Sequence, residues 1–314
     1  AAFILFVCPF VWSFSSPIFA TTKSATRKVA PSLKPNVNIE LPDFDELFGR
    51  IQAVSPLART IVNREKYLGF EAADKNDPFK WKTLEKNNNP NVPVNSIQKI
   101  DNFQDLGPPI LRLRSSLKGP CVGERFALMI MDLEARKKWD PQIENVYEAY
   151  PIRDLDTANI VIGDSKKYGD CARLGIGYCK TKSNVVVSPR EQLTLCGIQD
   201  FPDSSSMIWG VEMEDRHDHL LPGEERTVRA RSHLFSTTLV PTGPDSFDVE
   251  YVLQLEIGGK IPSFLTTPIV SETCKLLFKE AKKYFASGEV EKYLRAKEAI
   301  EDTFSGRKGI LFVP

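Results

Sequence analysis

The sequence has no excess of charge of either sign, because 41 Lys and Arg residues balance 41 Asp and Glu residues. A nucleic-acid-binding protein normally carries a basic surface, so this balance argues against that class of function. It also argues against binding to a membrane by electrostatic attraction alone. Charged residues make up 26% of the chain and apolar residues 42%. These values are ordinary for a folded protein with one large domain plus extensions, or with two small domains.

The cysteines are few and irregularly spaced, and no two of them form a C-x-x-C pair. They are Cys8, Cys121, Cys171, Cys179, Cys196 and Cys274. Because Cys8 lies in a segment that we expect to be removed, five remain. An odd number with irregular spacing is unlike a disulfide framework, so we expect buried free thiols rather than a redox or metal site.

Signatures of catalysis and of metal binding are also scarce. Of the three histidines, His217 and His219 lie in an acidic loop, and His233 lies on a predicted strand without an identifiable partner. Zinc sites need three or four converging ligands, so a solvated polar loop is the favoured interpretation of the first two. The Gly-Ile-Gly run at 175–177 is too short for a phosphate-binding loop, and no G-x-S-x-G motif occurs. We expect no catalytic residue, no metal and no cofactor.

The first 20 residues lack charge altogether. They are apolar and end in small residues up to Ala20, which is typical of a secretory signal peptide, and a membrane anchor is the alternative. Residues 21–39 hold four basic residues and no acid, which is typical of an organelle transit peptide. Together they resemble the bipartite leader of algae with secondary plastids. We therefore expect entry into the secretory pathway and a plastid location; a secreted or membrane-anchored protein is the alternative.

The region after the leader is predicted to begin with a helix. Apolar residues recur at helical spacing over 42–70, and Asp43 or Asp45 could cap its start. We assign 40–64 to an N-terminal helical extension. The sequence leaves open whether this region is the first helix of the main domain or a docking extension.

Alternation of apolar and polar residues predicts strands over much of the remaining chain, around one further helix at 122–138. The predicted strands lie at 110–114, 143–151, 159–162, 173–182, 184–196, 207–213, 228–240 and 247–256. In the last of these, apolar residues from Phe247 to Leu255 face one side and mostly polar residues face the other. We interpret it as an antiparallel strand with one buried and one solvated face.

The pair Thr267-Pro268 predicts the start of a long last helix, because Thr is a good N-cap and Pro is favoured at the first helical position. The helix is predicted to end near Ser287, before Gly288. Strands followed by one long amphipathic helix make an α+β pattern. A curved sheet around that helix can enclose a cavity where the facing side chains are small, as at Thr273 and Ala281. A filled core is the alternative.

Six short motifs follow one another in order over roughly residues 65–290. They are WKTLE at 81–85, ILRLR at 110–114, ARKKWDP at 135–141, SPREQLTL at 188–195, VRAR at 228–231 and EIGGKIPSFL at 256–265. In this order and spacing they resemble the START family of lipid-transfer domains. Glu191 and Glu256 stand where the family has Asp.

This resemblance implies a helix-grip fold, in which a curved antiparallel sheet wraps around a long C-terminal helix and encloses a cavity. The START-like domain would span 65–290, with a C-terminal helix and tail at 291–314. The cavity would hold one lipid, sterol or similar hydrophobic molecule, so we expect a non-enzymatic carrier or sensor. We also expect transient membrane contact, a monomer and no nucleic-acid partner. The alternative is an enzyme such as a polyketide cyclase or aromatase on the same fold, with an acid or base near Tyr251.

Candidate residues for ligand contact follow from this assignment. The cavity candidates are Arg190, Thr194, Met207, Trp209, Val211, Ser232, Leu234, Tyr251, Leu253, Thr273, Leu277 and Ala281. The candidates for the entrance are Phe201, Ile261 and Phe264. Arg190 and Arg231 could instead form structural ion pairs with Glu191 or Glu250. We interpret Trp139-Asp140 as a pair that stabilises the fold.

Overall fold

The structure is a computed structural model, and it describes a large part of the chain between residues 39 and 295. The described residues are 39, 41–87, 89, 93–101, 103, 107–118, 132–152, 162–183, 187–223, 227–261, 263–289, 291–292 and 295. The chain divides into Ala1–Pro35 and Asn36–Pro314, and only the second unit contains described residues. The predicted leader up to residue 38, most of the strand predicted at 159–162 and the tail from 296 lie outside them. The plastid location stays a prediction.

Two short helices open the described part of the chain, α1 (Phe44–Val54) and α2 (Pro56–Val62). The Asp43 carboxylate accepts hydrogen bonds from the backbone N–H groups of Asp45 and Glu46, which confirms the first of the two predicted caps. Ser55 caps α2 and separates the two helices, so the helical spacing found over 42–70 corresponds to two helices up to Val62. Two short turns, α3 (Phe70–Ala73) and the 3-10 helix η1 (Asp74–Asn76), lead to the first strand.

Ten strands form one sheet in the order β1-β2-β3-β10-β9-β7-β6-β5-β4, with β8 beside β6. Neighbouring strands along this path are antiparallel, and β8 is parallel to β6. The strands are β1 (Lys82–Lys86), β2 (Ser96–Ile100), β3 (Ile110–Lys118), β4 (Ile143–Ile152), β5 (Asp170–Thr181), β6 (Arg190–Asp200), β7 (Ser206–Glu212), β8 (Val228–Arg229), β9 (Arg231–Gly243) and β10 (Ser246–Glu256). The predictions at 143–151, 173–182, 207–213 and 247–256 agree with β4, β5, β7 and β10 to within three residues.

Three short helical segments and one long helix complete the described fold. They are α5 (Leu133–Trp139), α6 (Ser165–Tyr168), the 3-10 helix η2 (Asp215–Leu220) and α7 (Ser263–Ala286). The predicted start of α7 at Thr267-Pro268 is wrong, because the helix begins at Ser263 and contains Pro268. Near the helix start, proline removes only the bond to the carbonyl of Phe264. Gly288, at φ 74°, follows the end of α7 as predicted.

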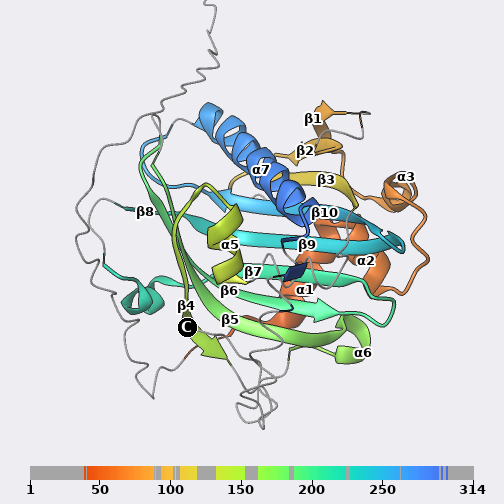
Figure 1. The fold of residues 1–314 in the computed structure, drawn as a ribbon, viewed down its shortest axis with the longest axis horizontal. Helices are drawn as coiled ribbons and strands as arrows, with labels where there is room; N and C mark the ends of the chain where they lie inside the picture. Colours follow the sequence, from red (N-terminus) through yellow and green to blue (C-terminus); the bar gives the residue numbers. More distant parts are fainter. Residues whose placement is uncertain are drawn as a thin grey trace, which may run out of the picture. The chain divides into compact units, whose positions relative to one another are not determined.

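Helices cover both faces of the sheet. α7 crosses one face, and α1 and α2 lie behind the sheet in Figure 1. Two separate hydrophobic clusters result, one that joins α1 and α2 to the sheet and one that joins α7 to it. The helices at 44–62 therefore share a core with the sheet, which answers the question that the sequence left open.

The back face of β10 is buried, contrary to the predicted solvated face. Asp248, Glu250 and Gln254 are 8%, 0% and 2% exposed. The segment from α1 to η1 covers them: Arg50 of α1 contacts Gln254, Ser55 and Leu57 contact Glu250, and Tyr67 donates to Asp248. Sequence alternation identified the polar face correctly, but buried polar residues with partners look the same in sequence as solvated ones.

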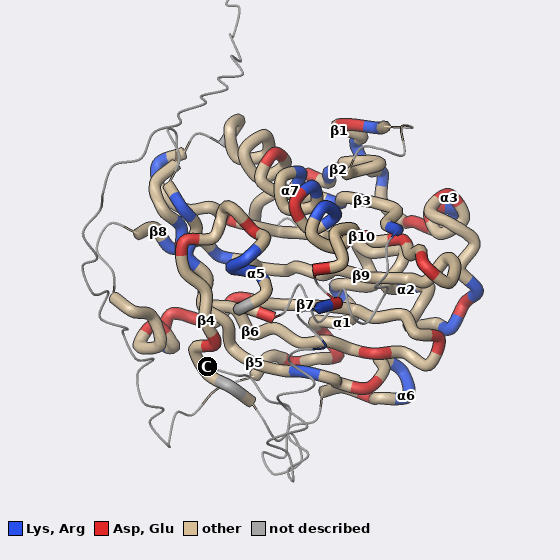
Figure 2. Tube along the Cα trace, viewed as in Figure 1, with Lys and Arg blue, Asp and Glu red and all other residues tan. Residues whose placement is uncertain are grey.

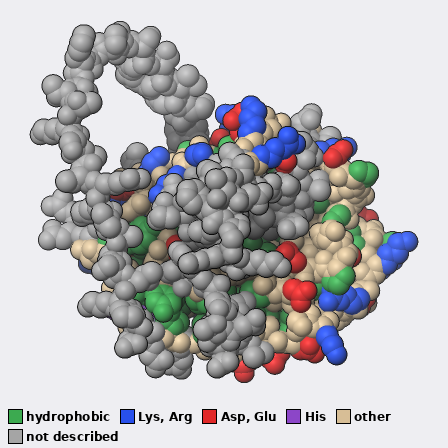
Figure 3. Space-filling model, turned by 60° about the horizontal axis from the view of Figure 1, so that its bottom comes forward, with side chains coloured by type: hydrophobic (Ala, Val, Ile, Leu, Met, Phe, Trp, Pro, Cys, Tyr) green, Lys and Arg blue, Asp and Glu red, His purple; other side chains and the backbone are tan. Residues whose placement is uncertain are grey.

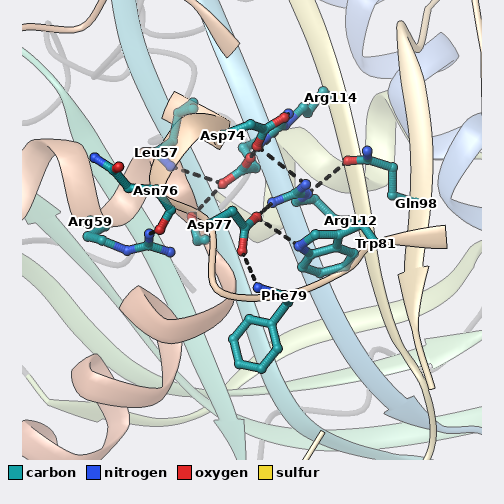
Figure 4. Close-up of polar contacts among 12 residues, drawn as sticks. Leu57, Arg59, Asp74, Asn76, Asp77, Phe79, Trp81, Gln98, Arg112 and Arg114 are labelled. Carbon is teal, nitrogen blue, oxygen red and sulfur yellow. Dashed lines mark hydrogen bonds and ion pairs between the residues drawn. The ribbon is translucent and has the colours of Figure 1, made fainter. Parts of the chain in front are cut away.

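A buried ion network fixes this N-terminal segment to the sheet (Figure 4). Arg112 of β3 binds Asp77 at 2.7 Å and lies over the ring of Trp81 at 4.0 Å. Arg114 of β3 binds Asp74 through two hydrogen bonds of 2.6 and 2.7 Å. Charges this deeply buried need partners, so Asp74 and Asp77 hold the N-terminal segment against the ILRLR strand, and Trp81 of WKTLE packs on Arg112.

Candidate functional site

A cavity of about 220 Å³ lies between α7, α5 and the sheet. One wall is the inner side of α7, with Val270, Thr273, Cys274, Leu277, Phe278 and Ala281. A second wall comes from β9 and β10, with Ser232, Phe235, Thr237, Tyr251, Leu253 and Leu255. The sequence left a cavity and a filled core as alternatives, and the cavity is present.

The remaining walls carry more polar and thiol groups. β4, β5 and β6 contribute Glu148, Gly177, Cys179, Gln192, Thr194 and Cys196. The α5 segment and the turn after it contribute Leu133, Arg136, Asp140 and Gln142. The charged and amide groups of the wall therefore come from α5, the turn after it and β4–β6, beside apolar residues such as Ile143 and Val146, whereas the wall from α7 and β10 is mostly apolar. An amphipathic molecule would match such walls.

Strand pairing shows which polar residues of the cavity wall are neighbours. Gly177 of β5 pairs with Glu148 of β4 and with Thr194 of β6. Cys179 pairs with Gln192 in the same way. Directly paired residues lie on one face of an antiparallel sheet, so these side chains form neighbouring rows in the cavity wall.

Arg136 and Asp140 form the charged part of the cavity wall. Arg136 Nε donates to Asp140 Oδ2 at 3.2 Å, and Asp140 Oδ1 accepts from the backbone N–H of Gln142 at 3.0 Å. Burial alone would lower the pKa of Arg136, but Asp140 together with Cys179 and Tyr251 raises it above its ordinary value. The guanidinium stays charged and carries further N–H groups for a ligand.

Hydroxyl and thiol groups elsewhere in the wall stay neutral. Burial raises the pKa of Cys179 to about 11 and those of Cys196 and Cys274 to about 12, and it also raises the pKa of Tyr251. All four cysteines that the structure describes, these three and Cys171, are free thiols, as predicted. The thiols therefore serve as neutral lining at physiological pH rather than as nucleophiles.

Seven of the twelve predicted contact residues line the cavity together. They are Thr194, Ser232, Tyr251, Leu253, Thr273, Leu277 and Ala281. They come from β6, β9, β10 and α7; β9 and β10 are neighbours in the sheet, and β7 separates β9 from β6 (Figure 1). Ligand contact by these side chains stays a prediction.

Four other candidates lie on the opposite face of the sheet. Met207, Trp209, Val211 and Leu234 belong to the cluster around α1, where the ring of Trp209 meets Phe44 and Phe48 at 5.6 Å each. Met207, Trp209 and Val211 share one face of β7, as the alternation predicted, but that face packs against α1 instead of facing α7. On β9 a bulge at His233 shifts the pairing, so Ser232 and Leu234 lie on opposite faces despite their even spacing.

Arg190 is absent from the cavity wall and bonds to backbone carbonyls instead. Its guanidinium donates to the carbonyl oxygens of Ile257 at 2.6 Å, Gly258 at 3.3 Å and Ser188 at 2.6 Å. These bonds hold the turn between β10 and α7, where Gly258 has a φ of 64° and any side chain would strike the carbonyl of Arg229. The predicted ion pair with Glu191 or Glu250 is replaced by these carbonyl contacts.

Other predicted pairings also have different partners. Arg231 binds Asp215 at 2.5 Å rather than Glu191 or Glu250. Trp139 is buried and stacks on Tyr284 of α7 with ring centroids 6.4 Å apart, which agrees with a fold-stabilising role. Asp140 also lines the cavity.

None of the three predicted entrance residues lines the cavity. Phe201 is buried in the cluster around α1, with the guanidinium of Arg64 over its ring at 4.9 Å. Ile261 is half-buried against the cluster around α7, and Phe264 is 74% exposed on the first turn of α7. Only Phe264 keeps the exposed position that the prediction requires.

Sequence reasoning missed several residues of the cavity wall. The clearest are Arg136, Gly177, Gln192, Phe235 and Phe278. The alternation of Gly175, Gly177, Cys179 and Thr181 on β5 was a usable signal, since it marks one strand face with small side chains. The Gly-Ile-Gly run at 175–177, which we did not interpret as a phosphate-binding loop, thus belongs to the cavity wall.

The histidine loop forms the 3-10 helix η2, and it is only partly solvated. His217 is 2% exposed, whereas His219 is exposed. Apolar neighbours such as Met213 and Leu220 are packed in the cluster behind the sheet, which draws this turn inward. Among the residues that the structure describes, no group of three or more His, Cys, Asp or Glu side chains could hold a metal ion.

His233 joins two carboxylates beside the turn into α7. Nδ1 lies 2.9 Å from Glu212 Oε1 and Nε2 lies 3.4 Å from Glu256 Oε2, and Arg231 also approaches Glu212. The hydrogen bond to Glu212 raises the pKa of His233, and Glu256 adds to the effect. The charged imidazole is therefore favoured in the folded state.

We expect the stabilising effect of His233 to depend on pH. Because the folded pKa lies above the ordinary value of about 6.5, the contribution is fully present below that value and is lost as the pH rises through the raised pKa. Replacement His233→Gln should cost up to about 1 kcal/mol at low pH and less at high pH, since the pair is partly exposed. Urea unfolding of both proteins from about pH 5.5 to about pH 9 measures this. A cost that does not change with pH would contradict it.

Comparison with known proteins supports the fold assignment. No protein-family model matches the chain, and no curated protein matches it. Human STARD10 is similar in structure with a TM-score of 0.53 and 17% identity, covering 82% of this chain and 86% of that chain. Human StAR-related lipid transfer protein 5 has a TM-score of 0.53 and 14% identity, covering 78% and 99%. The lipid transfer and protein localization domain of human StarD13 has a TM-score of 0.50 and 13% identity, covering 70% and 98%.

These similarities agree with the architecture described above. A large antiparallel sheet surrounds a cavity, and a long C-terminal helix closes it. The sequence motifs occur on the elements that build this arrangement, from Trp81 before β1 to the turn before α7. The chain therefore has the START helix-grip fold.

Proposed function

We propose that this protein binds one lipid or sterol molecule in the cavity beneath α7 and carries it, without chemical conversion, between membranes. The observation that supports this most directly is the cavity itself, which lies in the core with an apolar side of Leu253, Leu277 and Phe278. Burial of apolar ligand surface there contributes roughly 25 cal/mol per Å², so a hydrocarbon group can bind without a polar anchor.

The polar side of the cavity would orient the head group. Arg136 of α5 is the cationic residue in the wall, and Gln192 and Thr194 of β6 add an amide and a hydroxyl group. A ligand with its polar end toward α5 and its apolar end toward α7 and β10 satisfies both sides. We also propose that the carrier is a monomer.

The ligand path and the membrane contact are part of this proposal. Gln142 Nε2 donates to the carbonyl of Thr273 at 3.2 Å, so this bond joins the turn after α5 to α7 where both line the cavity. We infer that the ligand enters between these two segments. No described helix is both long and apolar enough to cross a membrane. Charges of both signs lie on the part of the surface that Figure 3 shows in colour. We propose the exposed Phe264 as the residue that makes transient membrane contact.

The enzymatic alternative has less support. It requires an acid or base near Tyr251, and Asp140 is the carboxylate that influences this tyrosine. Asp140 is already bonded to Arg136 and to the backbone of Gln142. No described histidine lines the cavity. We therefore favour a carrier.

Native mass spectrometry of protein purified from its own cell tests the proposal. We expect a bound mass that corresponds to one lipid per chain, released on denaturation and identified after extraction. Vesicle-to-vesicle transfer of the identified lipid should then be faster with the protein than without it. Protein that carries no lipid and binds none from a panel of sterols, fatty acids and phospholipids would overturn it. Conversion of the bound molecule during incubation would favour the enzyme instead.

A further inference from the structure

Gly177 leaves an open recess in the cavity wall. A Cβ atom built on Gly177 would have no other atom within 4 Å, apart from its own residue and its chain neighbours. Gly177 lies in the middle of β5 and lines the cavity, so this space belongs to the ligand chamber. Gly210 on β7 is a contrast, because its Cβ would lie 2.0 Å from the ring of Phe235.

The surroundings of the recess are polar on the sheet and apolar across the cavity. Gly177 pairs with Glu148 on one side and with Thr194 on the other, and all three line the cavity. The α7 wall carries Leu277 and Ala281. A ligand group that contacts Gly177 therefore has the polar residues Glu148 and Thr194 beside it on the sheet. The α7 wall of the same cavity offers it apolar residues.

We propose that Gly177 determines how bulky a ligand this cavity accepts, and that the recess receives a ring or a branched group with a polar substituent. This inference rests on the proposed lipid-binding function and deepens it. A single extended acyl chain would leave the recess unfilled, and unfilled space in a binding site forfeits the dispersion contacts of its walls. A wider ligand fills it and places its polar substituent near Thr194.

A graded series at this position tests the proposal in the full chain: Gly177→Ala, Gly177→Val, Gly177→Leu and Gly177→Phe. Ala should leave the bound lipids nearly unchanged. The Ala methyl group meets only open space, whereas the longer side chains of Leu and Phe would occupy the volume that the ligand needs. Leu and Phe should therefore lower the occupancy by ring-bearing or branched lipids about tenfold or more, the usual effect when a hydrophobic pocket no longer fits its ligand. Slim single-chain lipids should be retained better. Mass spectrometry of co-purified lipids and a binding panel of a sterol and a fatty acid give the readout.

Stability provides an independent measurement. Glycine weakens a strand interior, so larger residues that meet open space should keep or raise the thermal midpoint. Lower binding together with equal or higher stability identifies a filled chamber rather than a damaged fold. Gly49→Phe is the matched control, because Gly49 lies on the exposed side of α1 and its Cβ also meets nothing within 4 Å. It should leave the lipid profile unchanged.

The possible failures are distinguishable. If wild-type protein binds lipid and the folded Leu or Phe variants keep the same lipid profile and occupancy, the assignment of Gly177 is overturned. If the Phe variant does not fold, the Val and Leu variants decide the question in the same way. If wild-type protein binds no lipid at all, the proposed function is overturned, and this inference with it.

Discussion

Replacement Glu250→Gln should destabilise the protein by about 3–5 kcal/mol, the usual cost when one partner of a buried ion pair is removed. Glu250 is 0% exposed. Its two oxygens accept hydrogen bonds from Ser55 Oγ at 2.7 Å, the backbone N–H of Leu57 at 3.2 Å and Arg114 Nε at 2.7 Å. The carboxylate thus caps α2 and neutralises Arg114 at once. An amide keeps the shape but loses the charge and presents an N–H₂ group to these donors.

Urea unfolding measures the loss, and hydrogen exchange locates it. The amides of α2 should exchange faster in the variant, because this helix loses its contact with the sheet. Glu272→Gln is a matched control: Glu272 forms an ion pair with Lys275 at 2.6 Å, but its side chain is 71% exposed. Such a pair contributes at most about 1 kcal/mol. Equal small losses in both variants would show that the buried network does not anchor α2.

The sequence predicted the positions of the strands better than it predicted which side of the sheet their side chains face. The alternation on β10 identified both of its faces, and Tyr251 and Leu253 do line the cavity. The same reasoning on β7 placed Trp209 in the cavity, whereas the ring packs against Phe44 and Phe48 on the other side. Alternation states which residues share a face, but it does not state which helix covers that face. This choice depends on long-range packing of α1, which a local pattern does not contain.

A different limit applies to β9 and β6. The bulge at His233 inserts one residue into the pairing with β10, and nothing in the local sequence distinguishes it from a regular strand. Arg190 illustrates the same limit for polar residues, because two of its partners, the carbonyl oxygens of Ile257 and Gly258, lie 67 and 68 residues away along the chain. The resemblance that the order of the motifs carries, by contrast, predicted the fold correctly.

Replacement Arg136→Met should weaken binding of lipids with an anionic head group by about 30-fold, or about 2 kcal/mol, the usual contribution of a hydrogen bond to a charged group. Arg136 lines the cavity at the end of α5, where Figure 2 shows a basic cluster, and its pKa is raised by Asp140. The cation therefore remains available to an acceptor on the ligand. Phosphatidic acid and diacylglycerol with the same chains differ only in the phosphate, so their affinity ratio isolates this contact.

Two further variants separate charge from packing. Arg136→Lys keeps the charge but loses the planar donor geometry, so it should retain part of the preference for the anionic lipid. Lys137→Met removes the neighbouring cation, which is exposed on α5 and absent from the cavity wall, and it should leave the affinity ratio unchanged. Asp140 keeps its bond from the Gln142 backbone in every variant, so the local turn should persist. If Arg136→Met binds both lipids with the wild-type ratio, the head group does not lie against α5, and the polar strands β5 and β6 must orient the ligand instead.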